Sequence, residues 1–384
     1  MVLRRSTFSA ATNRTKLTSA RNRGGASPFA PLLPAPRRAG AIGPGKRATA
    51  SNGSSKRDCN PPASFRPKPA NTHKKGDSPL FQIMHDSIPW PRWKHALLAG
   101  YYAALAPYRW RNRRRWQHTG NAPVLVLMYH RVADDLATPW TVSNAVFERQ
   151  IDWLRANVDL ISMAEAQRRI REGSHRAAAC ITFDDGYADN CDSALPLLIR
   201  HRIPCVYFVT SRNVIDQRPF DHDVKRGAPS PPNTIEQIRA LADAGIEIGG
   251  HTRTHADLGQ IDDPAALRDE ILGGADDLAR MTLRPVRYFA FPFGQKPNLS
   301  GLAFRVARDG GLAAVCSAYG GFNFPGDDPF HLQRFAVDND LVRLKNWCGV
   351  DPRKLCKHPR FDFAASDFVI RGDESSDLTA SGRV

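Results

Sequence analysis

The chain has 384 residues, of which 42% are apolar and 24% are charged, and its formal net charge is +16. This composition excludes a collagen-like polymer and a wholly disordered chain, and the length accommodates two domains or one large α/β barrel with extensions. The charge is concentrated at one end, because residues 1–120 hold 23 of the 54 basic residues but 3 of the 38 acidic ones. The basicity therefore belongs to an extension, and we expect no nucleic-acid ligand for the main domain.

Residues 1–80 are the first predicted segment, a disordered basic extension. They are rich in Arg, Lys, Pro, Ser, Ala and Gly and show neither helical nor strand periodicity. Such a stretch cannot bury enough apolar area to offset its chain entropy. It also lacks the compact apolar run of a secretory signal, and Met84 is an alternative start.

Residues 81–120 are predicted to contain a short apolar and aromatic helix followed by a cluster of Arg residues. The apolar run, 95–108, is too short to span about 30 Å of hydrocarbon. We favour a helix that docks on the main domain. The flanking Trp and Arg side chains leave two alternatives: contact of residues 90–115 with a membrane surface, and, ranked last, a nucleic-acid patch.

Residues 121–345 show strands alternating with helices. Apolar runs predict strands at Val124–Met128, Ala178–Phe183, Cys205–Val209, Ile246–Gly249, Arg287–Phe291, Leu312–Cys316 and Arg334–Val337. Helical patterns with N-caps and closing glycines predict helices from Ser143 to about Asn157 and at Met163–Glu172, Asp189–Arg202, Thr234–Ala244, Pro264–Met281 and Leu302–Asp309. Along the chain these strands and helices alternate.

This alternation predicts an α/β fold with a parallel sheet. No G-x-G-x-x-G sequence opens any unit, so a barrel is preferred to an open dinucleotide-binding sheet. Residues 212–233 form a Pro-rich, charged insertion between a strand and a helix, where barrels build substrate contacts. Residues 346–384 are assigned to a C-terminal tail.

Residue types that bind metals follow three of the predicted strands directly. They are Asp184-Asp185, the pair His251 and His255, and His130. In a parallel barrel these positions meet at one face. Two imidazoles and a carboxylate are the ligands of a catalytic divalent site, and a second carboxylate can act as general base. Each motif alone is also compatible with a plain turn or cap, so the prediction depends on their joint occurrence.

These residues resemble the signature motifs of the polysaccharide deacetylases, the NodB-homology group called carbohydrate esterase family 4. Thr182–Gly186 (TFDDG) and His251–His255 (HTRTH) are similar to the first two motifs, and Phe289–Gly294 (FAFPFG) to the third. Val126–Val132 (VLMYHRV) resembles the N-terminal strand of the branch that includes poly-N-acetylglucosamine deacetylases. The resemblance covers roughly residues 123–340 and implies an irregular (β/α) barrel with seven strands.

The resemblance also implies roles for individual residues. Asp184 would be the general base, and Asp185, His251 and His255 would hold a divalent metal, zinc first and cobalt or nickel as alternatives. The backbone N–H of Phe293 would stabilise the oxyanion. The substrate would be an acetylated amino-sugar glycan, from which an N-acetyl group is removed as acetate.

Two positions depart from the family pattern. Ala290 stands where many members have an Arg that steadies the catalytic Asp, and no Leu-x-His motif supplies the general acid. We take His331 as the candidate acid, with His222 and His130 as alternatives. Five residues are candidates for substrate contacts: His130, Tyr187, His222, Phe291 and Pro292.

Three other functions remain open at this stage. The same site could serve an O-acetyl esterase or an amidase on a non-sugar amide, or the chain could be a non-catalytic carbohydrate-binding relic. The seven cysteines are odd in number and contain no CxxC, which disfavours a disulfide framework. We therefore expect a cytoplasmic protein, with a peripheral membrane location as the variant.

Overall fold

The computed structural model describes residues 92–355 and 360–363. The predicted extension 1–80 lies outside the described residues, as does most of the predicted tail 346–384. Where a single helix is predicted within residues 81–120, the structure has two, α2 (Arg92–Ala104) and α3 (Ala106–Thr119), which meet at Leu105. Pro107 in the first turn of α3 accounts for the break, because proline is accepted there but not in a helix interior.

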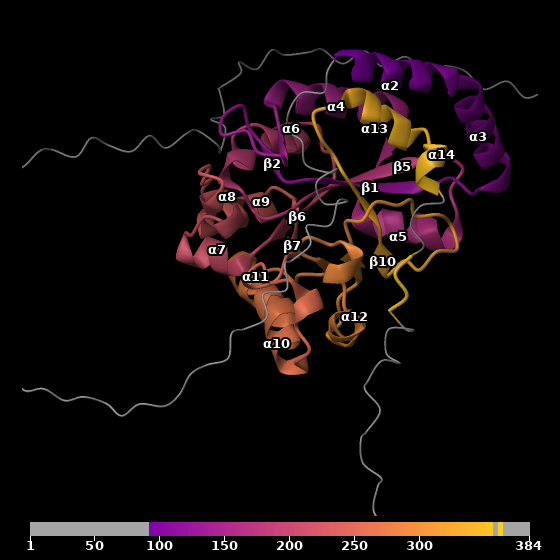
Figure 1. Cartoon of the computed structure of the whole chain (residues 1–384). Helices are drawn as coiled ribbons and strands as arrows, with labels where there is room; N and C mark the ends of the chain where they lie inside the picture. The colour runs from indigo at the N-terminus through magenta and orange to yellow at the C-terminus, as the bar shows by residue number, and fades with distance from the viewer. Residues whose placement is uncertain (1–91, 356–359, 364–384) are drawn as a thin grey trace, which may run out of the picture. The chain divides into compact units, whose positions relative to one another are not determined.

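A nine-stranded sheet forms the centre of the domain (Figure 1). Eight strands follow one another in the order β10-β9-β8-β7-β6-β5-β1-β11, and every pair is parallel. Their bounds are β1 (Val124–Tyr129), β5 (Ala178–Phe183), β6 (Cys205–Val209), β7 (Glu247–Gly250), β8 (Tyr288–Ala290), β9 (Ala314–Cys316), β10 (His331–Leu332) and β11 (Arg334–Ala336). The short β4 (Asp159–Leu160) also pairs with β5, and β2 (Arg131–Val132) pairs with β3 (Thr141–Val142).

One short stretch of chain closes the sheet into a barrel. The two strands at the ends of the order, β10 and β11, are separated only by Gln333. Residues 331–336 therefore pair with β9 on one side and with β1 on the other. Counting this stretch as one strand gives seven around the barrel, which confirms the predicted irregular seven-stranded (β/α) fold.

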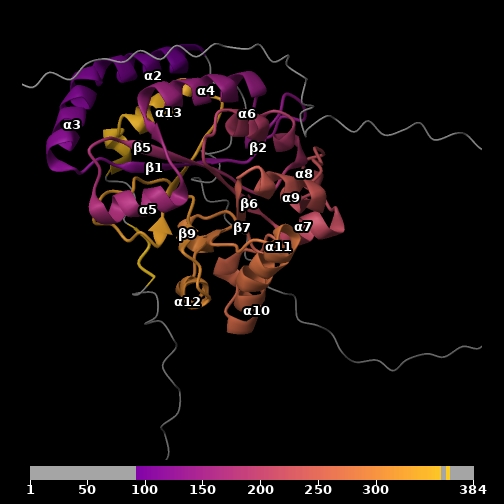
Figure 2. The same cartoon turned by 180° about the vertical axis from the view of Figure 1, so that it is seen from behind.

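Helices cover the outside of the barrel in both views (Figures 1 and 2). They are α4 (Asn144–Asn157), α5 (Met163–Glu172), α6 (Ala194–Arg200), α7 (Ser211–Asp216), α8 (Asp221–Lys225), α9 (Ile235–Asp243), α10 (Pro264–Arg268), α11 (Gly274–Thr282), α12 (Gly301–Asp309), α13 (Leu341–Cys348) and α14 (Pro352–Leu355). Within the described part of the chain no helix has the length and apolar character needed to cross a membrane.

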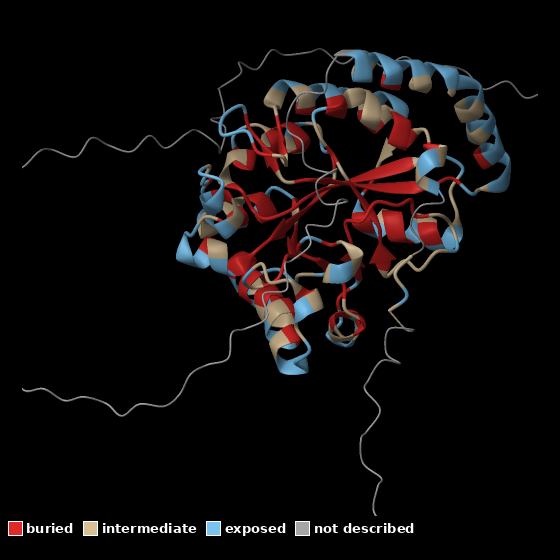
Figure 3. Ribbon diagram, in the orientation of Figure 1, coloured by how far each residue is buried: buried red, intermediate tan, exposed pale blue. Residues whose placement is uncertain are grey.

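The strands are buried on both faces, as parallel strands in a barrel must be (Figure 3). Residues such as Cys180, Phe208 and Leu332 fill the barrel interior. Their neighbours along each strand, for example Ile181 and Tyr207, pack against the surrounding helices instead. This alternation decides which side chains reach the inside of the barrel.

Two predicted helices differ in detail from the structure. The predicted helix 264–281 consists of α10, a π-helical turn at Asp269–Gly273, and α11. The predicted helix 189–202 begins with a 3₁₀ turn at Ala188–Cys191 before α6. The insertion 212–233 is also partly helical, because it contains most of α7 and all of α8.

Candidate active site at the carboxyl ends of the strands

Asp185, His251 and His255 converge, as the sequence predicts. Asp185 follows β5, and both histidines follow β7. The Oδ1 atom of Asp185 lies 3.3 Å from Nε2 of His251 and 3.2 Å from Nε2 of His255. Asp185 and His251 are buried, and His255 is partly exposed.

A second hydrogen bond holds His251 in the orientation that this cluster requires. Its Nδ1 donates to the carbonyl oxygen of Ala290 over 2.8 Å, which leaves the lone pair of Nε2 directed at Asp185. Ala290 therefore contributes its backbone where many family members use an Arg side chain. Such outer contacts fix the tautomer and the ring plane of a ligating histidine.

The backbone of the site is held in left-handed conformations that non-glycine residues rarely adopt. The φ angles are +75° at Asp185, +60° at Thr252, +62° at His255 and +60° at Phe293. Gly186 follows with φ +98°, as predicted for a sharp turn after the two aspartates. Strained residues of this kind persist where the surrounding structure dictates them, and they cluster at functional sites.

The loop that carries the two histidines is anchored on the helix between α10 and α11. The Glu270 carboxylate accepts hydrogen bonds from the backbone N–H groups of Arg253 and Thr254, both 3.0 Å, and from the Thr254 hydroxyl at 2.7 Å. The Arg253 guanidinium bonds Asp277 on α11. Sequence analysis missed Glu270 and Asp277, because acidic residues on an amphipathic helix carry no local signal of such a contact.

The second carboxylate, Asp184, is buried in a two-pronged ion pair with Arg334 of β11. The Arg334 guanidinium donates to Asp184 Oδ1 at 2.6 Å and to Oδ2 at 2.7 Å. Burial opposes ionisation of Asp184, but Arg334 and the nearby His251 outweigh it, so the pKa of this carboxyl is lowered. Arg334 thus orients Asp184, the role that the resemblance gives to an arginine at position 290. This role of Arg334 was not predicted from the sequence.

His130, which follows β1, is close enough to Asp184 and Asp185 for their charges to act on its ring. Burial lowers the pKa of its imidazole, and the negative charges of Asp185 and Asp184 partly compensate. Its backbone carbonyl accepts a hydrogen bond from Asn190, which holds the turn after β1. Of the three histidines considered as general acid, His130 is the one whose environment includes both carboxylates.

Residues of the insertion form a wall beside His255. The rings of Phe220 and His222 lie 5.3 Å and 5.6 Å from the ring of His255. Tyr187, a candidate substrate contact, is fully buried behind this wall, where its hydroxyl donates to Asp223 Oδ2 at 2.7 Å and lies 3.2 Å from Nε2 of His222. Tyr187 therefore offers no free ring face to a sugar, whereas His222 is partly exposed.

Phe293 also lies against His255. Its ring lies 5.1 Å from that of His255 and is 44% exposed, so it can accept a sugar. Among the described residues no hydrogen-bond acceptor faces its backbone N–H, which stays available to an oxyanion.

Three of the predicted site residues lie elsewhere or are covered. His331 faces away from the barrel interior, packs on Phe304 of α12 and bonds Ser317 through Nε2 at 2.9 Å. Phe291 stacks on Phe304 as well, and Pro292 is buried. The physical reason is strand alternation, because Leu332 and Ala290 take the inward positions beside His331 and Phe291. His331 is therefore not placed to donate a proton at this cluster.

The Asp185 cluster fits a divalent metal ion. One ligand atom from each of its three residues lies within 4.8 Å of the other two. Asp185 Oδ1 is buried and makes no hydrogen bond of acceptable geometry, although such an acceptor is costly to leave unsatisfied. Two imidazole nitrogens and one carboxylate oxygen are ligands that suit zinc, cobalt or nickel and leave positions open for other groups.

These features define a (β/α) barrel with a candidate metal centre at the carboxyl ends of its strands. Residues 171–315 match the family described as “Polysaccharide deacetylase”. The matched span includes Asp184, Asp185, His251, His255 and Phe293, but neither His130 nor Arg334.

Two curated proteins resemble part of the chain. One is YxkH of Bacillus subtilis (strain 168), whose name places it among the polysaccharide deacetylases; it is 27% identical over 140 residues, 36% of this chain and 45% of that protein. The other is a chitooligosaccharide deacetylase of Bradyrhizobium sp. (strain ANU 289), 30% identical over 115 residues, 30% of this chain and 44% of that protein. The chain therefore spans less than half the length of either relative.

A solved structure shows the same fold over a larger part of the chain. IcaB from Ammonifex degensii superposes with a TM-score of 0.50 and 24% identity, covering 60% of this chain and 98% of that one. At 24% identity, this similarity supports the assignment of the fold alone.

Proposed function

We propose that the protein is a metal-dependent deacetylase that removes N-acetyl groups from an amino-sugar polysaccharide or oligosaccharide. The observation that carries the proposal is the pairing of two different carboxylates at one place. Asp185 lies between two imidazoles, while Asp184 is held apart from them by Arg334. One carboxylate can therefore bind a metal while its neighbour accepts a proton.

Asp185, His251 and His255 would hold the ion, which supplies an activated water and polarises the acetyl carbonyl. Asp184 would take the proton of that water as general base. Its lowered pKa keeps it ionised at neutral pH, and the two bonds from Arg334 fix the direction of its oxygens. The Phe293 N–H would donate to the oxygen of the acetyl group as negative charge develops there.

The amine that leaves needs a proton, and we assign its donation to His130. The negative charges of Asp185 and Asp184 favour the protonated form of this ring against its burial, whereas His331 is packed behind the sheet. Substitution of His130 by Gln should lower kcat by about 10²-fold. Substitution of His331 by Gln should leave kcat within about threefold and lower thermal stability instead, because it disturbs a buried hydrogen bond. A large loss of kcat in His331→Gln with a small one in His130→Gln would instead identify His331 as the general acid.

The substrate class rests on three points: the family, the name of the Bradyrhizobium relative, and the shape of the site. The exposed Phe293 and the partly exposed His222 both lie against His255, where their rings would contact a sugar. A zinc ion is the first choice for this donor set, and cobalt or nickel the alternatives.

Acetate release from N-acetylglucosamine oligomers, with Zn²⁺ or Co²⁺ added, tests the proposal directly. We expect activity in the wild type and a loss of about 10²- to 10⁴-fold in Asp184→Asn, with bound metal unchanged, because the general base is removed and the ligands are kept. Equal activity in both would eliminate Asp184 as the base. Turnover of O-acetylated xylan but not of N-acetyl sugars would identify the esterase, and bound metal without any turnover would identify a binding relic.

A further inference from the structure

The exposed side of the helix pair α2–α3 combines apolar residues, mostly on α2, with basic residues, mostly on α3. Trp93, Leu97 and Trp110 are 60%, 66% and 58% exposed, and they are three of the nine large apolar side chains exposed in the described chain. Gly100 and Ala104 are exposed between them, at helical spacing from Trp93 and Leu97. Figure 3 shows both helices mostly exposed.

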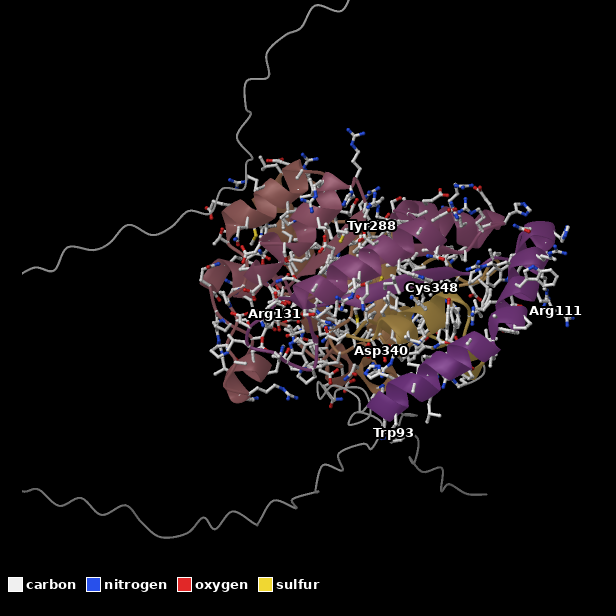
Figure 4. The ribbon with its side chains drawn as sticks, turned by 90° about the horizontal axis from the view of Figure 1, so that it is seen from above. Trp93, Arg111, Arg131, Tyr288, Asp340 and Cys348 are labelled. Carbon is white, nitrogen blue, oxygen red and sulfur yellow. The ribbon has the colours of Figure 1, made fainter. Side chains whose placement is uncertain are left out.

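The inner face of the same pair already docks on the barrel unit. Leu98 and Trp116 are buried, the Tyr101 hydroxyl donates to Asp351 at 3.0 Å, and His95 lies 3.3 Å from Asp340. The docking helix expected from the sequence is therefore present. It explains the inner face but not the exposure of Trp93, Leu97 and Trp110, here called the Trp93–Trp110 face, and Figure 4 shows the labelled Trp93 and Arg111 at the edge of the molecule.

Charge identifies the kind of surface that this face fits. Residues 92–119 contain seven Lys and Arg residues and no Asp or Glu. Two copies of the chain would repel each other through this face, so a second copy does not fit it. A polyanion fits the positive charge of this face, but nucleic acid makes no use of its exposed apolar side chains. An anionic membrane surface uses both features, because Trp, Leu and Ala enter the headgroup region while Lys and Arg meet the phosphates.

We propose that the Trp93–Trp110 face of α2–α3 binds the surface of an anionic membrane, lying in its plane. Helices of 13 and 14 residues are too short to span a bilayer but long enough to lie in its interface. The proposal is independent of the deacetylase activity.

Sedimentation of the full chain with lipid vesicles tests this inference. The probes are vesicles of phosphatidylcholine alone and vesicles in which about a third of the lipid is phosphatidylglycerol, at about 150 mM salt. We expect the wild type to bind the anionic vesicles. The double variant Leu97→Glu, Trp110→Glu should bind at least about tenfold more weakly, since it places carboxylates in the apolar stripe.

A matched control separates this face from net charge. Leu136 and Leu283 are also exposed, at 48% and 84%, and lie outside α2–α3. The double variant Leu136→Glu, Leu283→Glu changes the charge equally and should keep vesicle binding within about twofold. Equal losses in both double variants, or no binding by the wild type, would overturn the proposal. Binding of a DNA duplex that falls in parallel, or a wild-type dimer that the helix variant dissociates, would assign the face to another partner and overturn it too.

Discussion

The Asp184–Arg334 pair is buried on both sides, so its two charges depend on each other. The exposed fractions of the two side chains are 3% and 0%. Arg334 also donates from Nε to the carbonyl of Ser317, which fixes the guanidinium plane. Removing one member of such a pair leaves the other charge buried without compensation, which is costly even where the pair itself adds little net stability.

Replacing Arg334 by Met should therefore lower the free energy of unfolding by about 3–5 kcal/mol. It should also raise the pKa of Asp184, so that the acidic limb of the pH–activity profile moves to higher pH. Urea unfolding and a pH–rate profile measure the two effects. The control is Arg287→Met, which removes an exposed pair with Glu247 and should cost at most about 1 kcal/mol. Similar losses in both variants would argue against a special role for Arg334.

Asp223 is a buried carboxyl, and Nε2 of His222, whose pKa burial lowers to about 4, lies 3.7 Å from its Oδ1. Burial raises its pKa from 3.8 to about 6, against the hydrogen bond from Tyr187. Because the folded state then binds the proton of Asp223 more tightly than the unfolded state, the contribution of this one group to stability is most favourable at low pH and falls as the pH rises from about 4 to about 6.

Asp223→Asn should remove this loss. At pH 8 the variant should be more stable than the wild type by about 2 kcal/mol, and at pH 4 the two should be nearly equal. Thermal unfolding at the two pH values measures the difference. Asp221→Asn, an exposed position on the same short helix, should show no such pH dependence. A wild type that becomes more stable between pH 4 and pH 8 relative to Asp223→Asn would contradict the assignment.

At the scale of elements, the π-helical turn between α10 and α11 sets the position of the histidine loop. Glu270 in this turn accepts hydrogen bonds from the backbone of Arg253 and Thr254, and Gly274, which follows the turn, lets the histidine loop approach the helix closely. A Cβ added at Gly274 would meet the backbone of Arg253 at 3.0 Å. Helical irregularities of this kind are frequent at functional sites.

Glu270→Ala should loosen the loop that carries His251 and His255. We expect zinc affinity to fall by about 10- to 100-fold, as for other residues that orient metal ligands from outside. Competition against a chelating dye measures the affinity. Asp276→Ala, an exposed position on α11, is the control and should leave it unchanged. An unchanged affinity in Glu270→Ala would show that the loop holds its shape without this carboxylate.

At the scale of the molecule, metal binding at the candidate site would be coupled to global stability, because its residues follow strands β5 and β7. A metal that binds only the folded state stabilises it by about 2.7 kcal/mol at one hundred times its dissociation constant.

Chelation with EDTA should therefore lower the Tm of the wild type, and added Zn²⁺ should restore it. In the double variant Asp185→Asn, His251→Ala neither treatment should move the Tm, because the ligand set is broken. Scanning calorimetry measures both. The same shift in wild type and variant would locate the metal elsewhere in the chain.

Much of the fold was predictable from local patterns in the sequence. Strand alternation, N-caps and closing glycines located the seven barrel strands, and the joint occurrence of Asp184-Asp185 with His251 and His255 located the metal cluster. This works because the carboxyl ends of parallel strands meet at one face whatever the details of the packing. The buried positions of Cys180 and Cys205 follow from the same apolar runs.

Other features depended on contacts between residues far apart in the sequence. The pairing of Arg334 with Asp184 spans 150 residues, and the strand that holds Arg334 also closes the barrel. Gln333 separates β10 from β11, and His331 faces outward where Leu332 faces in. No short pattern near His331 or Phe291 records which face of the sheet each side chain takes.

The sequence by itself therefore determined the class of fold and the candidate metal ligands and base, since those follow from residue type and strand register. Only the tertiary structure decided which arginine orients Asp184, which histidine lies beside it, and which face of α2–α3 remains exposed. These features depend on how distant segments pack together, and the sequence of a single segment does not determine that packing.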